Sequence, residues 1–268
     1  MHGYSIKNPP PASQVYNGDE IGFDPNGQSP RVVSFRWTKN HYALGTGEKA
    51  PFWVTVFFMT RADGTVVIPP CIIHMGVCPG EDLSGIVDYN LSSFGPDLES
   101  DKYIPSDFLY WQNPAGYNDQ AGFMQICKHF VQFAPRRSND TPLFFFMDAH
   151  ESHLNPDALQ YLKDNNVFAF FLRANNSDVD QPNDNGPNSK LKSLFNHFLG
   201  LYNIKMSRAW KLSKPAFNYI FTQAWEEFQR TAGTVCYNAF VKTGIHPPNP
   251  DSPNNQVSHS LTPPPPIP

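Results

Sequence analysis

Runs of apolar residues bounded by turn residues predict most of the strands of this chain. Residues 143–148 begin with five consecutive apolar side chains and end in Asp148, which is typical of a strand buried on both faces of a sheet. A second buried strand is expected at 167–172. Alternation, or enrichment in β-branched and aromatic residues, predicts the other strands, at 13–23, 31–37, 52–60 and 65–75. The pair Pro69–Pro70 must interrupt strand pairing or lie at an edge of the sheet.

Apolar residues at helical spacing predict the helices, at 118–133, 155–165, from 189 onward, 217–230 and 234–241. Asn155 and Pro156 suit the N-cap and the first position of the second of these helices. That helix joins the strands at 143–148 and 167–172, so we expect a parallel β-α-β unit with a right-handed crossover. Residues 76–107 follow no clear period. The pattern as a whole predicts an α/β fold.

Length and composition limit the classes of protein that the chain can represent. The 268 residues suit one domain, expected at 13–245, between a flexible lead-in at 1–12 and a disordered Pro-rich tail at 246–268. The formal charge of −4 gives no global sign of nucleic-acid binding, so such binding would depend on local charge. The four cysteines have no CxxC spacing and are expected to be free thiols in a reducing compartment. With no signal peptide and no apolar run of membrane-spanning length, we expect a soluble intracellular protein.

Three acids are candidates for chemistry: Asp19 in the first strand, Asp148 at the end of a central strand, and Asp184 in or before a helix. An acid at the carboxyl end of a buried strand is costly to desolvate unless a positive group meets it, and active sites of open sheets collect there. The simpler alternative for Asp148 is a cap of the next helix. Carboxylates bind Mg²⁺ and Mn²⁺, and a pair of such ions can activate a water or a 3′-hydroxyl and stabilise the leaving oxygen of a phosphodiester. Because the chain has 24 acids, spacing alone does not single out this triple.

The residues beside these acids allow two interpretations. His150 and His153 follow Asp148 in an Asp-x-His-x-x-His pattern, which could bind Zn²⁺ or Fe. Alternatively, the two histidines order the turn around Asp148. Glu20 is next to Asp19 in a predicted strand, so its side chain is expected on the opposite face of the sheet.

The chain becomes basic after residue 189. Six basic residues precede the next acid, Glu226: Lys190, Lys192, Lys205, Arg208, Lys211 and Lys214. A basic stretch after a cluster of acids suits a site that holds metal ions against a phosphate backbone. A solvated helical face explains the same charges equally well.

Several short motifs follow one another along residues 16–250. They are Asp-Glu-Ile-Gly-Phe at 19–23, a hairpin at 51–75, a Gly-Tyr segment and helix at 116–130, Asp-x-His-x-Ser-His at 148–153, Gln-Pro-x-Asp at 181–184, and a closing Thr-Gly-Ile-His-Pro at 243–247. In this order they resemble the catalytic domain of DDE-superfamily endonucleases, the transposases of the pogo/Tigger/Jerky type. The separation of Asp148 and Asp184 by 36 positions is also similar to the spacing in that family.

The resemblance implies a ribonuclease-H-like mixed sheet flanked by helices. It implies that Asp19, Asp148 and Asp184 form the catalytic and metal-binding triad for two Mg²⁺ or Mn²⁺ ions. The implied activity is cleavage, with strand transfer, of DNA phosphodiester bonds. The implied partners are DNA and further copies of the chain on DNA ends, in the nucleus.

Two departures from the family pattern concern the third acid. Residues 173–178 read Arg-Ala-Asn-Asn-Ser-Asp in place of the usual Pro-Pro-Asn-x-Thr run, and Asn183 replaces the usual Leu. The loop before Asp184 is therefore expected to be rebuilt, with Asp178 and Asp180 as alternative ligands. Such transposases also carry N-terminal helix-turn-helix modules, so these residues alone are expected not to select a DNA sequence. The alternative function is an inactive or domesticated transposase remnant that serves as a DNA- or protein-interaction module.

Overall fold

The computed structural model of the protein describes residues 9–23, 53–75, 105, 107–172, 180–205, 212, 214–249 and 252. The predicted strand at 31–37 lies outside these residues, as do most of the predicted lead-in, most of the predicted tail and nearly all of 76–107. Asp178, Arg208 and Lys211 also lie outside them.

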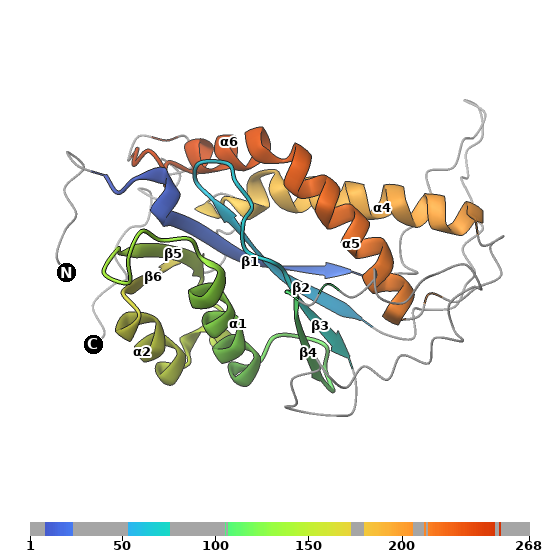
Figure 1. Ribbon diagram of the computed structural model, residues 1–268, viewed down its shortest axis with the longest axis horizontal. Coiled ribbons are helices and arrows are strands. Elements are labelled where there is room, and N and C mark those ends of the chain that lie inside the picture. Colours follow the sequence, from blue (N-terminus) through green and yellow to red (C-terminus); the bar gives the residue numbers. More distant parts are fainter. Residues whose placement is uncertain are drawn as a thin grey trace, which may run out of the picture.

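A six-stranded mixed sheet runs through the centre of the molecule, in the order β4-β3-β2-β1-β5-β6 (Figure 1). β1 pairs antiparallel with β2 and parallel with β5, which in turn pairs parallel with β6. The strands are β1 (Val15–Phe23), β2 (Val54–Arg61), β3 (Cys71–Met75), β4 (Leu109–Asn113), β5 (Leu143–Asp148) and β6 (Val167–Leu172). Three antiparallel strands followed by two parallel ones make a ribonuclease-H-like sheet, and β4 extends it by one parallel strand at the edge. The predicted fold class is confirmed.

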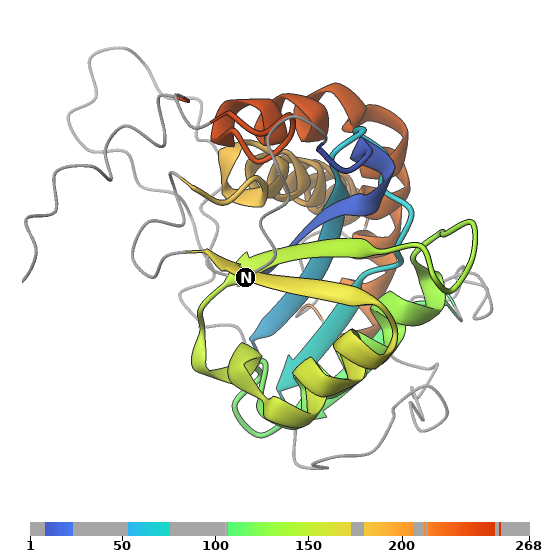
Figure 2. The same ribbon diagram turned by 90° about the vertical axis from the view of Figure 1, so that its left-hand side faces the viewer.

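Helices cover both faces of the sheet (Figures 1 and 2). One layer contains α1 (Gln120–Phe133) and α2 (Pro156–Asp164); the other contains α4 (Pro187–Lys205), α5 (Lys214–Thr231) and α6 (Gly233–Thr243). Short 3-10 helices lie at η1 (Ala12–Gln14), η4 (Glu151–Leu154) and η5 (Asn183–Asn185). Because side chains alternate along a strand, neighbouring residues serve different cores: Phe57 packs in the core under α1 and α2, and Phe58 packs in the core under α5.

The predicted β-α-β unit is confirmed as β5-α2-β6. The Asn155 side chain accepts hydrogen bonds from the backbone N–H groups of Asp157 and Ala158, and Pro156 is the first residue of α2. Asp148 is therefore not the cap of this helix.

The first and last parts of the described chain are also in contact: Nε2 of His246 lies 3.0 Å from the carbonyl oxygen of Pro10.

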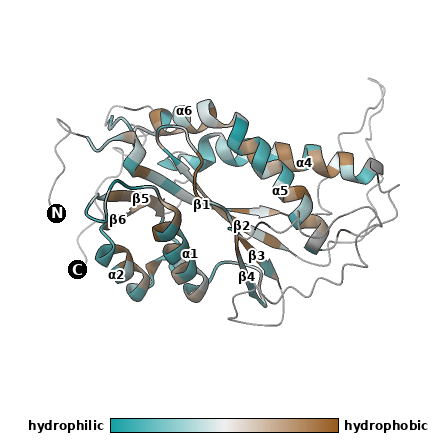
Figure 3. Cartoon of the chain, viewed as in Figure 1, coloured by the Kyte–Doolittle hydropathy of each residue, from teal (hydrophilic) through white to brown (hydrophobic). Residues whose placement is uncertain are grey.

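Three expectations about strands were wrong or incomplete. β6 is an edge strand rather than a buried one, and Phe168 and Phe170 are 41% and 40% exposed despite its hydrophobic sequence (Figure 3). The strand expected at 65–75 begins only at Cys71, because the two prolines before it provide no N–H groups for pairing. β4 was not predicted, since five residues without alternation give too short a pattern.

The expectation of free thiols is confirmed for the cysteines that the structure describes. Cys71, Cys127 and Cys236 are buried and free. Burial raises the pKa of Cys236 to about 12, which makes this thiol a poor nucleophile.

Gly18 in β1 provides a test of the packing beneath α1. A Cβ atom there would lie 2.7 Å from the rings of both Phe57 and Phe145, so the two aromatic side chains approach each other only across a glycine. We expect Gly18→Ala to destabilise the protein by about 1–3 kcal/mol.

Gly200 in α4 provides the matched control. Outside the nearby backbone of the helix itself, no atom of the described residues lies within 4 Å of a Cβ built there, so Gly200→Ala is expected to stabilise the protein by about 1 kcal/mol through helix propensity. Urea unfolding of both variants measures the two changes. Equal effects of the two substitutions would contradict the described packing at Gly18.

Candidate active site

A buried amide network attaches η5 to the sheet. Asn183 is fully buried, and its backbone N–H donates to Oδ1 of Asn17 at 2.8 Å. Its side chain donates to the carbonyl oxygen of Phe58 at 3.2 Å and accepts from the hydroxyl of Thr60 at 2.5 Å. Asn17 in turn donates to the carbonyl oxygen of Phe146 in β5 at 2.9 Å. The Asn that departs from the family pattern is thus satisfied by partners on β1 and β2, and it fixes the position of the next residue, Asp184.

The side-chain amide of Asn188, four residues after Asp184, bonds both Asp19 and Asp184. Nδ2 of Asn188 donates to Oδ2 of Asp19 at 2.7 Å and to Oδ1 of Asp184 at 2.8 Å. The other oxygen of Asp19 accepts from the backbone N–H of Glu20 at 2.8 Å. Asp184 is exposed, whereas Asp19 is buried. The first and third predicted acids, Asp19 and Asp184, are therefore brought together from distant parts of the sequence.

The surroundings of Asp19 disfavour its charged form. Burial, together with the negative charge of Asp184, raises its pKa from 3.8 to about 8, and the Asp148 charge acts in the same direction. The hydrogen bonds from Asn188 and Glu20 offset only part of this rise. A carboxylate that is buried beside other carboxylates is short of positive charge, and a bound cation would supply it.

Asp148 lies at the end of β5 and is paired with His153. Extending the register of β1 and β5 by two residues places Asp148 beside Asp19. Its Oδ1 lies 2.7 Å from Nδ1 of His153, and Nε2 of that ring lies 3.2 Å from Oε1 of Glu20. Asp19 lies opposite Phe58 and Glu20 opposite Phe57 on β2, and these two rings pack in different cores, so Asp19 and Glu20 face opposite sides of the sheet as expected. Glu20 also takes part in the site through His153.

His153 is a buried cation held between two acids. Burial alone would lower its pKa, but the hydrogen bonds and charges of Asp148 and Glu20 outweigh burial and raise the pKa to about 9. Burial would raise the pKa of Asp148, yet the bond to His153 and its charge keep that pKa below the usual value. His153 thus favours the ionised form of Asp148 against the effect of burial.

The remaining predicted ligands are arranged differently. His150 is exposed; its backbone N–H lies 3.4 Å from Asp148, and its ring bonds Ser152. Oδ1 of Asp180 is buried without a hydrogen-bond partner. Within the residues that the structure describes, no three or more His, Cys, Asp or Glu side chains are grouped to hold a metal ion. The described side chains therefore form a complete metal site neither from Asp19, Asp148 and Asp184 nor from Asp148 with His150 and His153.

The predicted basic residues are only partly described. Lys190 and Lys192 lie in the first half of α4, the helix that carries Asn188. Lys205 ends that helix, and Lys214 begins α5. The structure places the first two on the same helix as the candidate site.

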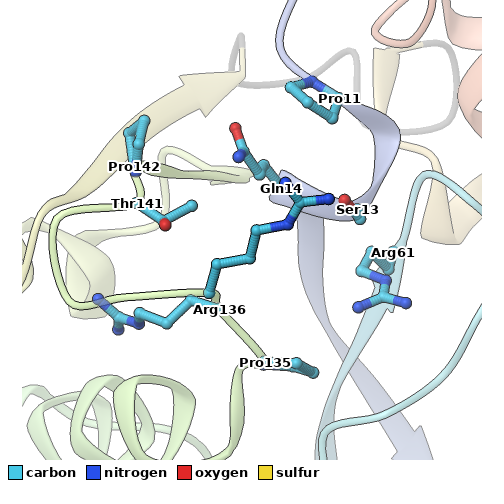
Figure 4. Close-up of a pocket in the computed structure, with 9 residues that line it drawn as sticks. Pro11, Ser13, Gln14, Arg61, Pro135, Arg136, Thr141 and Pro142 are labelled. Carbon is cyan, nitrogen blue, oxygen red and sulfur yellow. The ribbon is translucent and has the colours of Figure 1, made fainter.

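A second cationic feature was not predicted. A cavity of about 650 Å³ lies at the amino ends of β1 and β5, where Ser13 and Gln14 face Thr141 (Figure 4). Its described lining contains three arginines and no acid; these are Arg61, Arg136 and Arg137. Arg61 is paired with Asp63 at 2.8 Å. Nη1 of Arg136 donates to the carbonyl oxygen of Asn165, whereas its Nη2 is buried without a hydrogen-bond partner.

Sequence reasoning missed Asn188, Asn183 and the arginine cavity as functional features. The signal for Asn188 was its closeness in sequence to Asp184, although Asp184 lies in η5 and Asn188 in α4. Arg61 precedes Arg136 and Arg137 by 75 positions or more, so only the fold brings it to them.

Comparisons with known proteins do not establish a family. No family model matches the chain. It is 24% identical over 239 residues to the "MFS-type transporter clz9" of Cochliobolus lunatus, a match that covers 88% of this chain and 24% of that protein. The chain therefore spans about a quarter of the length of this curated relative, and the similarity assigns no activity. No helix among the described residues has the length and apolar character needed to cross a membrane.

Solved structures similar to this chain include several of the Mos1 mariner transposase. The strand transfer complex has a TM-score of 0.48 at 13% identity, with 88% of this chain and 53% of that chain covered. The paired end complex with Mn has a TM-score of 0.47 at 13% identity, with 88% and 54% covered. The catalytic domain with Raltegravir and Mg has a TM-score of 0.35 at 12% identity, with 89% and 85% covered. At these values the likeness is too low to assign a function, which depends on the side chains described above.

The pairing of His153 predicts a loss of stability at alkaline pH. Its folded pKa is above the unfolded value, so the stabilisation is fully present below pH 6.5 and is lost as the pH rises through about 9. The difference between the two pKa values corresponds to about 3 kcal/mol. We expect the free energy of unfolding of His153→Gln, measured in urea without metal ions, to vary less than that of the wild type between pH 6 and 9.

Asp19 acts in the same direction, because a raised carboxyl pKa also removes stability as the pH rises through about 8. The difference between wild type and His153→Gln isolates the histidine. His197→Gln, at an exposed position in α4, is the control for removing a histidine. Parallel profiles for wild type and His153→Gln would contradict the described pairing.

Proposed function

We propose that this chain is the catalytic domain of a DDE-type transposase that cleaves and transfers DNA strands with the help of divalent metal ions. The observation that carries the proposal is the meeting of Asp19 and Asp184 at one amide, with Asp148 on the adjacent strand. The order of motifs that resembles pogo/Tigger/Jerky-type transposases supports the same reading. The site of action would be nuclear DNA.

The residues present fit a divalent cation. Asp19 and Asp184 provide hard oxygen ligands, and the raised pKa of Asp19 reflects a site short of positive charge. When bound, Mg²⁺ or Mn²⁺ would neutralise these acids and favour an attacking hydroxide at neutral pH. A second ion would need Asp148 as a ligand.

The side chains of the chain itself have separate tasks in this proposal. Asp19 is held by Asn188 and by the backbone of Glu20, so its two oxygens are fixed in direction. His153 favours the ionised form of Asp148, the form that binds a cation. Oε1 of Glu20 accepts a hydrogen bond from Nε2 of His153. This bond fixes the orientation of the imidazole ring and favours its charged form.

A non-enzymatic role is the second candidate. The pairing of Asp148 with His153 satisfies that acid without a metal ion, which would also be true of an inactive remnant that keeps the fold. Such a chain would act as a DNA- or protein-interaction module. Metal-dependent cleavage separates the two candidates.

Plasmid nicking tests the catalytic proposal. We expect the purified chain to nick supercoiled DNA in the presence of Mn²⁺ or Mg²⁺, and Asp148→Asn or Asp19→Asn to lower the rate by more than about a hundredfold. Asp157→Asn changes an exposed acid in the first turn of α2 and should leave the rate unchanged. A folded chain that binds DNA but does not nick it with either metal would favour the remnant.

The arginine cavity would hold a phosphate of the bound DNA. Arginine guanidinium groups match phosphate geometry, and Arg136 and Arg137 both line the cavity. The hydroxyls of Ser13 and Thr141 line the same cavity. Because the cavity lies at the amino ends of the strands and the acids lie farther along them, a duplex could contact both.

Salt dependence tests this contact. In metal-free buffer, the double variant Arg136→Gln/Arg137→Gln should bind a labelled duplex more weakly, with the slope of log affinity against log salt reduced by roughly two. Fluorescence anisotropy measures both quantities. Lys128→Gln/Lys163→Gln removes two exposed charges from α1 and α2 and serves as the control. An equal reduction by both double variants would contradict a specific phosphate site.

A further inference from the structure

The amide of Asn188 is bonded on only one of its two sides. Its Nδ2 donates to both Asp19 and Asp184, whereas its Oδ1 is buried without a hydrogen-bond partner. A buried carbonyl oxygen without a donor is costly, and such groups in a folded protein call for an explanation. The position of this oxygen, on an amide that bonds two acids of the candidate site, suggests an explanation: a role in metal binding.

The positions around the amide match the spacing of ligands on one cation. Oxygen ligands lie about 2.0–2.1 Å from Mg²⁺ in an octahedron, so neighbouring ligands are about 2.9 Å apart. Nδ2 of Asn188 lies 2.7 Å from the Asp19 oxygen and 2.8 Å from the Asp184 oxygen. An oxygen atom in place of Nδ2 would therefore have the separations expected of a third ligand beside the two carboxylates.

A half-turn of the amide about its last side-chain bond would put an oxygen there. The turn exchanges the positions of Oδ1 and Nδ2 and leaves the rest of the residue in place. Since Oδ1 makes no hydrogen bond now, the only bonds lost are the two that Nδ2 makes to the acids. A cation between the acids would replace those two bonds.

We propose that Asn188 is a ligand of the metal ion and reverses its amide when the ion binds. Without metal, Nδ2 holds Asp19 and Asp184 together; with metal, Oδ1 joins them in coordinating the ion. This inference rests on the proposed function, because it requires a cation at these acids. It adds a neutral amide oxygen to the two acids as a third ligand.

Two substitutions should change metal affinity in opposite directions. Asn188→Asp keeps the size of the side chain and replaces the donor by an oxygen. It should raise the affinity for Mn²⁺ about tenfold and lower the melting temperature of the metal-free protein, because three carboxylates then meet. Asn188→Ala removes the ligand and should lower the affinity about tenfold or more. Its metal-free melting temperature should also be lower, because the two bonds to the acids are lost.

Isothermal titration with Mn²⁺ and thermal unfolding with and without the ion measure these effects without any need for activity. Asn139→Asp, the same chemical change at an exposed position before β5, is the control and should match the wild type in both. A purely structural amide would make Asn188→Asp lose both stability and metal affinity.

The possible outcomes separate this inference from the proposed function. Opposite changes of affinity in the two variants would support Asn188 as a ligand. Wild-type binding of Mn²⁺ with both variants within twofold of it, or both weaker than it, would overturn the role of Asn188 and leave the proposed function standing. Absence of Mn²⁺ binding by the wild type would overturn both.

Discussion

The buried hydrogen bonds of Asn183 determine whether this protein has a site at all. They attach η5 to β1 and β2, and Asp184 follows Asn183 directly. In a water-excluded interior, every partner of such a network must be present, because an unpaired amide costs more than the network gains. The side chain therefore fixes the position of η5 in a way that a leucine of similar size could not, since its amide accepts from the hydroxyl of Thr60 and donates to the carbonyl oxygen of Phe58. The departure from the pattern of the family that the sequence resembles is thus matched by polar partners on β2.

The electrostatics of the three acids are not equivalent. Asp148 has a buried cation, His153, as its partner, and Glu20 stabilises that cation from the other side. Asp19 is buried, accepts from neutral donors and lies near the charges of Asp184 and Asp148, so its pKa rises to about 8. The charge of Asp148 is thus compensated by His153, whereas Asp19 lies among negative charges. In the proposed function, a cation beside Asp19 would reduce this repulsion rather than replace an existing ion pair.

The prediction of strands from apolar runs was reliable for type and weaker for position in the sheet. The runs at 143–148 and 167–172 are almost equally hydrophobic, yet β5 is central and β6 is at the edge. Apolar composition records the tendency of a segment to be buried, but the number of neighbours that a strand acquires depends on the order of the sheet. The same limit explains β4, whose five residues join the sheet only because β3 offers a free side. His153 reaches Asp148 across a turn of five residues, which leaves little freedom in where its ring lies.

The sequence by itself determined the local elements, the β-α-β unit around Asp148 and the opposite directions of Asp19 and Glu20, because these depend on residues close together in the chain. Only the tertiary structure decided which acids meet, that Asn188 lies between two of them, and that Glu20 reaches His153. It also brought Arg61 to Arg136 and Arg137 around one cavity. The contacts of Asn188 with Asp19, of Glu20 with His153 and of Arg61 with the other arginines join residues far apart in the sequence. The distance between such residues depends on strand order and helix packing, which no local pattern of the sequence records.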